Sequence, residues 1–198
     1  SVTTTDMFIG SNGSAACSST LAPTPSPYFF DNSTLAGAVD EWFSDSTTTG
    51  VKYGDISIWD TSSVTTMQAM FHSATAFNDD GAQWDTSVVT TMAYMFYSES
   101  ATSFNGDISQ WDTSSVATMT SMFSSTSFDG DVSQWDTSIV TTMYYMFRSA
   151  ASFNVDISQW DTSSVTTMGY MFNSASSFNG DVSQWDTSSA TTMQAMFY

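Results

Sequence analysis

Aspartate recurs in two columns of this chain, at intervals of about 25 residues. The first column contains Asp55, Asp107, Asp131, Asp156 and Asp181, with Asp80 close to its register, and the second contains Asp60, Asp85, Asp112, Asp136, Asp161 and Asp186. If the repeats stack, neighbouring carboxylates lie about 5 Å apart, and Ca²⁺ would relieve their repulsion. A calcium column at Asp107, Asp131, Asp156 and Asp181 is therefore one hypothesis. The alternative, which we favour, is that aspartates cap helices and accept hydrogen bonds in turns.

No set of residues suggests catalysis. His72 is the only histidine, and its counterparts in later repeats are Tyr97, Ser124, Arg148 and Asn173. A position that varies so freely is typical of a solvent-facing site. The single cysteine excludes an internal disulfide, and nucleophilic or metal-hydrolytic mechanisms lack the residues they need. The sequence therefore predicts that the protein is not an enzyme, with Ca²⁺ as the one possible cofactor.

A tryptophan marks each repeat, and a Met-Phe pair ends twelve residues after it. The six tryptophans are Trp59, Trp84, Trp111, Trp135, Trp160 and Trp185. This spacing lies in the range of solenoid proteins, whose repeats bury their apolar sides by stacking.

Two elements are predicted within each repeat. Val64, Met67, Met70, Phe71 and Ala74 follow a spacing near i, i+3, i+7, which indicates a short helix. Residues 105–109 contain one strong apolar residue among short polar ones, which suggests a brief strand. The predicted fold is therefore an α/β repeat, a leucine-rich-repeat-like solenoid with one short strand and one short helix per coil.

Three segments are expected along the chain. Residues 1–30, rich in Ser, Thr and Pro, form an extended arm. Residues 31–53 form an N-terminal cap, in which Leu35, Val39, Trp42 and Phe43 share one helix face. Residues 54–198 form the six-copy solenoid, whose last copy is incomplete.

The two ends of the chain suggest self-assembly. Solenoid ends normally carry a polar cap, whereas the last copy would expose Trp185, Met193, Met196 and Phe197. The apolar cluster Met7, Phe8 and Ile9 in the arm could anchor on another subunit by strand addition. A head-to-tail contact of this kind generates a filament.

Composition limits the partners and the location. The net charge is −18, with Lys52 and Arg148 as the only basic residues. This charge repels nucleic acid and anionic membranes, and no apolar run is long enough to span a bilayer. The scarcity of lysine, the many Ser and Thr residues and the start at Ser1 indicate an extracellular protein. Asn12 and Asn32 begin N-glycosylation sequons, and Asn32 could serve as helix cap, as glycan site or as both.

The pattern FNGDISQWDTSSVTTM followed by Met-Phe is similar to the bacterial surface protein repeat of about 25 residues found in mycoplasma lipoproteins and related to BspA-like leucine-rich repeats. The similarity covers about residues 54–198. It implies an extracellular, solenoidal, adhesive or surface-coating protein and brings no catalytic residues. Two departures are the lack of a visible lipid anchor and Lys52, which stands where later copies have Phe.

These observations favour an extracellular structural protein that polymerises end to end into a surface fibre or coat and carries glycans. The alternative is an adhesin that binds a ligand on a strand face lined by Asn, Asp and Ser. A minor alternative is an ice-binding solenoid, because threonine also recurs in a column. Its members are Thr61, Thr86, Thr113, Thr137, Thr162 and Thr187.

Overall fold

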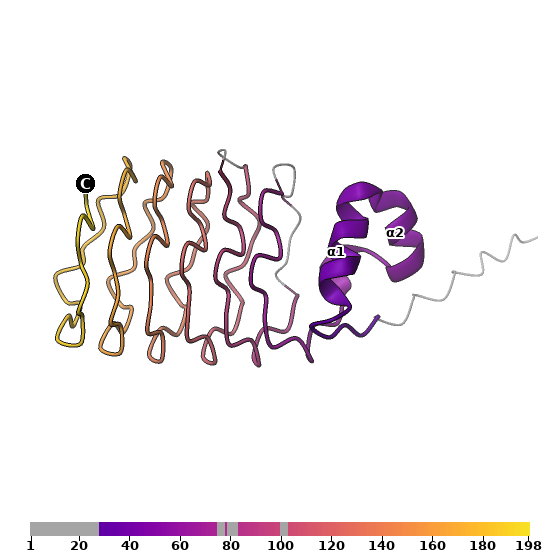
Figure 1. Cartoon of the computed structure of the whole chain (residues 1–198), viewed down its shortest axis with the longest axis horizontal. Coiled ribbons are helices and arrows are strands. Elements are labelled where there is room, and N and C mark those ends of the chain that lie inside the picture. Colours follow the sequence, from indigo (N-terminus) through magenta and orange to yellow (C-terminus); the bar gives the residue numbers. More distant parts are fainter. Residues whose placement is uncertain (1–27, 75–77, 79–82, 100–102) are drawn as a thin grey trace, which may run out of the picture.

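The computed structural model describes residues 28–74, 78, 83–99 and 103–198. These residues form a row of stacked coils with two helices at its N-terminal end and the C-terminus at the other (Figure 1). Helix α1 spans Leu35–Ser44, α2 spans Ser46–Tyr53, and the short 3-10 helix η1 spans Ile56–Ile58. The described part of the chain contains no other helix and no strand, only isolated β-bridges. The prediction of an α/β repeat with a strand and a helix in every coil is therefore wrong.

The predicted helix of each repeat is a ribbon of tight turns. In the first coil, Met70 N–H donates to the Met67 carbonyl at 3.3 Å and Ala74 N–H to the Phe71 carbonyl at 3.1 Å. Ala69 and Ser73 have φ values of 56° and 58°, and a positive φ at the third residue is what a type II turn requires. Such turns also bring residues at i and i+3 to the same side. The apolar spacing therefore fitted a helix although the backbone forms turns.

The amides that the turns leave free bind the next coil. Met67 and Ala69 donate to the carbonyls of Thr91 and Ala93 at 3.0 and 2.9 Å, and the same pattern continues from coil to coil. One parallel bridge joins each neighbouring pair of coils. The bridged residues are Thr66, Thr91, Thr118, Thr142, Thr167 and Thr192. Because backbone amides are satisfied in two directions, the coils stack without forming strands.

The predicted strand at 105–109 is absent for a local reason. The Asp107 carboxylate accepts a hydrogen bond from Ser109 N–H at 2.9 Å, and Trp111 N–H donates to the Ile108 carbonyl at 3.2 Å. Aspartate side chains compete in this way with backbone pairing and favour turns. Ile108 is nevertheless buried, with 2% of its surface exposed. The inward position of Ile108 was predicted correctly, but the conformation around it was not.

Aromatic columns fill the core. The Met-Phe phenylalanines stack along the row at centroid distances of 5.3–5.7 Å. Four tryptophans donate from Nε1 to a carbonyl of the preceding coil at 2.8–3.3 Å, namely Trp84 to Ile56, Trp135 to Ile108, Trp160 to Val132 and Trp185 to Ile157. These four tryptophans therefore both pack the core and fix the register of two coils, whereas Trp59 donates to the Gly54 carbonyl of its own coil.

The N-terminal helices and the residues before them cover the first coil. Phe30 N–H donates to the Asp60 carbonyl at 2.9 Å, and the Phe30 ring lies 4.7 Å from that of Trp59. Trp42 of α1 meets Trp59 edge-on at 5.9 Å. Lys52 of α2 pairs with Glu41 of α1 at 2.8 Å. These contacts seal the first coil at its N-terminal side.

Candidate binding surfaces

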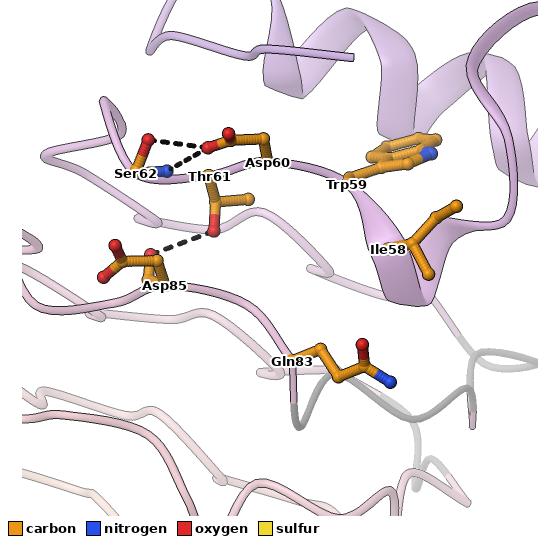
Figure 2. Close-up of a pocket in the computed structure, with 7 residues that line it drawn as sticks. All are labelled: Ile58, Trp59, Asp60, Thr61, Ser62, Gln83 and Asp85. Atoms are coloured by element: carbon orange, nitrogen blue, oxygen red, sulfur yellow. Dashed lines mark hydrogen bonds between the residues drawn. The ribbon is translucent and has the colours of Figure 1, made fainter. Parts of the chain in front are cut away.

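The aspartate columns lie along the turns that edge the coils. Figure 2 shows one such place, an open pocket between the first two coils. There the Asp60 carboxylate accepts hydrogen bonds from the backbone and side chain of Ser62, at 3.0 and 2.6 Å. Asp85 makes the same pair of bonds with Ser87. The carboxylates in this pocket therefore already hold the turns of their own coils.

The same bonds recur in both columns and lower the pKa of several of the carboxylates. Hydrogen bonds from the side chain and backbone of Ser114 lower the pKa of Asp112, and those from the backbone and side chain of Ser109 lower the pKa of Asp107. Within the described ranges, no three His, Cys, Asp or Glu side chains are grouped so that they could hold a metal ion. Asp107, Asp131, Asp156 and Asp181 each accept a bond from the serine two residues on, while Asp80 lies outside the described residues.

The threonine column considered for ice binding faces inward. Thr61, Thr86, Thr113, Thr137 and Thr162 expose at most 1% of their surfaces. Each donates from Oγ1 to the carbonyl of the aspartate that opens the next coil's Asp-Thr-Ser turn, at 2.9 Å. Only Thr187, in the last coil, is exposed. This column holds the coils together and presents no flat threonine array.

Asn32 closes the first coil with its side chain. Its Oδ1 accepts hydrogen bonds from Thr65 and Thr66 N–H at 2.8 and 3.2 Å, and its Nδ2 donates to Thr65 Oγ1 at 2.7 Å. In the next coil, Thr90 N–H donates to a backbone carbonyl of the preceding coil instead. At the start of α1, the carboxylate that accepts backbone amides belongs to Asp31. Asn32 thus stands in for a preceding coil and is not the helix cap.

The residues predicted for assembly lie partly outside the described chain. Met7, Phe8 and Ile9 fall there, as does the sequon residue Asn12. In the last coil, Met193 and Phe197 expose 42% and 60% of their surfaces, while Trp185 and Met196 are buried. The expected contact between the arm and this surface therefore remains a prediction.

A tyrosine cluster on the coils was not predicted. It consists of Tyr144, Tyr145 and Tyr170, whose ring centroids are 4.1–6.0 Å apart. All three side chains are half-buried. A side-chain hydrogen bond to Tyr145 raises the pKa of Tyr144 to about 12. The sequence signal was the Tyr-Met-Phe triplet at 94–96, 145–147 and 170–172.

The predicted solvent-facing position of His72 is confirmed, since the side chain is exposed. Its ring lies 5.2 Å from that of Tyr97, its counterpart in the next coil.

Among the described helices, none has the length and apolar character needed to cross a membrane.

A comparison with known protein families matches most of this chain. The family model described as "Mycoplasma protein of unknown function, DUF285" matches residues 37–138 and 100–198. The two matched regions overlap and together run from α1 to the last residue. No curated protein and no solved structure matches the chain.

Proposed function

We propose, from the premise that this chain belongs to the DUF285 family, that it is an extracellular adhesive repeat protein whose row of coils presents a binding face. The supporting observation is a division between fixed and variable positions within each repeat. The Asp, Thr, Trp and Phe columns are engaged in turns, coil-to-coil bonds and the core. The positions between the two methionines vary, from Gln68-Ala69 to Tyr144-Tyr145.

This division is typical of repeat proteins that bind ligands, because a fixed core supports surface positions free to differ between repeats. Ala93, Ser121 and Gly169 are buried, whereas the other residues at these positions are exposed or half-buried. They lie on adjacent coils, so a ligand that spans several coils meets several of them at once. The charge of −18 favours partners other than nucleic acids and anionic membranes.

The test has two parts. Antibody labelling of intact source cells is expected to detect the protein without permeabilisation. Beads coated with the purified full chain are expected to adhere to cell surfaces or to surface polysaccharide, whereas beads coated with an acidic control protein of equal charge are not. Labelling only after permeabilisation, or equal adhesion of both bead types, would refute the proposal.

End-to-end assembly is the second candidate, and the exposed Met193 and Phe197 favour it. Phe197 stacks on Phe172 at 5.5 Å, and its opposite side has no further coil in the described chain. A following coil or a second copy would cover this surface by the same stacking. Sedimentation and negative-stain microscopy test the second copy: filaments that Phe197→Asp abolishes support assembly, and short particles alone contradict it.

A further inference from the structure

We infer that the tyrosine cluster is a binding site for a neutral glycan, an inference that rests on the proposed adhesive function and names its ligand class. The cluster lies on two adjacent coils. Tyr144 and Tyr145 come from one coil and Tyr170 from the next, and Tyr145 and Tyr170 are 5.0 Å apart with their planes 31° from parallel. The Tyr144 ring stands almost perpendicular to that of Tyr170. The cluster thus presents two roughly aligned aromatic surfaces and a third as a side wall.

The fold does not require these tyrosines. Tyr94 occupies the position of Tyr145 and Tyr170 in one further coil, but the remaining three coils have Ala69, Ser121 and Ala195 there. Ser121 N–H donates to the next coil's carbonyl at 2.9 Å, as Tyr145 does at 3.1 Å. Both tyrosines have positive φ, 61° and 56°, as Ala69, Ser121 and Ala195 do at the same turn position of other coils, so the turn forms equally with small side chains.

A glycine makes room for the third ring. A Cβ built on Gly169 would lie 3.0 Å from Cε2 of Tyr144 and 3.3 Å from Cγ2 of Thr192. The Tyr144 ring and the Thr192 methyl group therefore lie on the same side of the coil at Gly169. No other repeat has glycine at this position, where Gln68, Ala93, Thr120, Tyr144 and Gln194 stand. Among the six repeats, glycine therefore occupies this position only in the coil that carries Tyr170.

The local charge differs from that of the whole chain. The Arg148 guanidinium lies 5.4 Å from the Tyr145 ring centroid, and its side chain is exposed. Lys52, the other basic residue, is paired with Glu41. The cluster therefore combines aromatic faces with hydroxyl groups and one positively charged guanidinium donor.

A neutral sugar fits this combination. Aromatic faces pack against the C–H face of a pyranose ring, and tyrosine, threonine and arginine exchange hydrogen bonds with its hydroxyl groups. The single positive charge of Arg148 offsets little of the net charge of −18, so the chain as a whole repels an anionic glycan at long range although a guanidinium lies beside the rings. Proline-rich peptides also stack on tyrosines, but the hydroxyl groups around the rings favour a ligand that is polar along its whole length.

The experiment titrates the full chain with neutral cello-, xylo-, manno- and chito-oligosaccharides by NMR and calorimetry. We expect one class to bind independently of salt. The double variant Tyr145→Ser/Tyr170→Ser, which carries the residue that Ser121 provides elsewhere, is expected to bind about tenfold or more weakly. The control is Tyr97→Ser, on the second coil, whose ring contacts those of His72 and Tyr94, and its affinity is expected to equal that of the natural chain.

Three results would overturn the inference: no binding of any of these sugars at millimolar concentration, equal affinity of the double variant, or preferential binding of an acidic oligosaccharide or a polyproline peptide. Thermal unfolding checks that each variant is folded. The bead assay separates this inference from the proposed function. Adhesion that persists in the double variant leaves the function standing and removes the site, whereas sugar binding without adhesion removes the function alone.

Discussion

At the N-terminal end of the row, the side chain of Asn32 makes the hydrogen bonds that the backbone of a preceding coil makes elsewhere. The Asn32 amide supplies both an acceptor for two amides of the first coil and a donor for Thr65 Oγ1. Because the same Nδ2 is the atom that N-glycosylation modifies, the predicted glycan role of Asn32 would compete with this closing role. Asn12, the other sequon residue, lies outside the described chain.

Removal of the Asn32 amide is expected to destabilise the protein. In protein produced without N-glycosylation, Asn32→Ala should lower the free energy of unfolding by about 1–2 kcal/mol, because the backbone amides of Thr65 and Thr66 lose their acceptor. Asn32→Asp retains the acceptor and should lose less. Urea unfolding measures both, and equal losses would show that the acceptor is not what matters.

The turn residues with positive φ lead to a second prediction at the residue scale. Ala69 is exposed and has a φ of 56°, a conformation that costs non-glycine residues about 1 kcal/mol or more. Ala69→Gly relieves this strain, but glycine also raises the entropy of the unfolded chain, which offsets part of the gain. The free energy of unfolding should therefore stay unchanged or rise by up to about 1 kcal/mol. Ala117→Gly is the control, since Ala117 is not left-handed, and it should lose about 0.5–1 kcal/mol. Thermal unfolding compares the two, and a loss at Ala69 as large as at Ala117 would contradict the prediction.

At the scale of elements, the coil replaces the helix and the strand as the unit of structure. Each coil is a series of turns held by aspartate side chains and by i to i+3 backbone bonds, and each relies on its neighbours for the remaining bonds. Neighbouring coils are joined by backbone bonds, by the Thr Oγ1 column, by tryptophan Nε1 and by stacked phenylalanines. Stability of such an array is the sum of coil terms and neighbour terms.

The threonine column allows a direct measurement of one neighbour term. Thr137→Val keeps the shape of the side chain but removes the bond from Oγ1 to the Asp161 carbonyl. We expect a loss of about 1–2 kcal/mol, because a partly buried carbonyl is left without this donor. Thr187→Val in the exposed last coil is the matched control and should have little effect. A comparable loss at both positions in urea unfolding would mean that the β-branched shape, not the bond, stabilises the turn.

At the scale of the whole molecule, charge and turn chemistry oppose each other. A net charge of −18 destabilises the compact chain through self-repulsion. Several carboxylates are nevertheless stabilised in their ionised form, because serine and threonine donors bind them and lower their pKa. Ser33 and Thr34 lower the pKa of Asp31 to about 2, and serine donors lower the pKa of further aspartates of both columns, namely Asp85, Asp107, Asp112, Asp156, Asp161, Asp181 and Asp186.

The sign of the pH dependence follows from these shifts. A carboxyl group whose pKa is lower in the folded chain stabilises the fold above its unfolded pKa, near 4, and this contribution is lost as pH falls towards the folded pKa. We expect the melting temperature to change little from pH 7 to 5 and to fall between about pH 4 and 2. Asp112→Asn/Asp161→Asn/Asp186→Asn keeps an acceptor in each turn but does not titrate, so its fall should be shallower. A melting temperature that rises on acidification would show that relief of repulsion dominates.

The sequence by itself determined the repeat, its register and the inward-facing residues. The spacing of tryptophans and Met-Phe pairs identified the columns that fill the core, because apolar residues at a fixed interval must share one side of a stacked unit. It also indicated that aspartates serve turns. Composition suggested an extracellular protein without catalytic groups, which remains part of the proposal.

Only the tertiary structure decided the conformation of the coils and the surfaces they expose. A spacing of i and i+3 fits a helix and a ribbon of turns equally, and the choice depends on amides such as that of Met67, which bind a residue 24 positions away. The burial of Thr137, the closing role of Asn32 and the meeting of Tyr144 with Tyr170 likewise arise from contacts between coils. Local propensity carries no information about such distant partners, and the surfaces available for binding therefore emerged only once the coils were stacked.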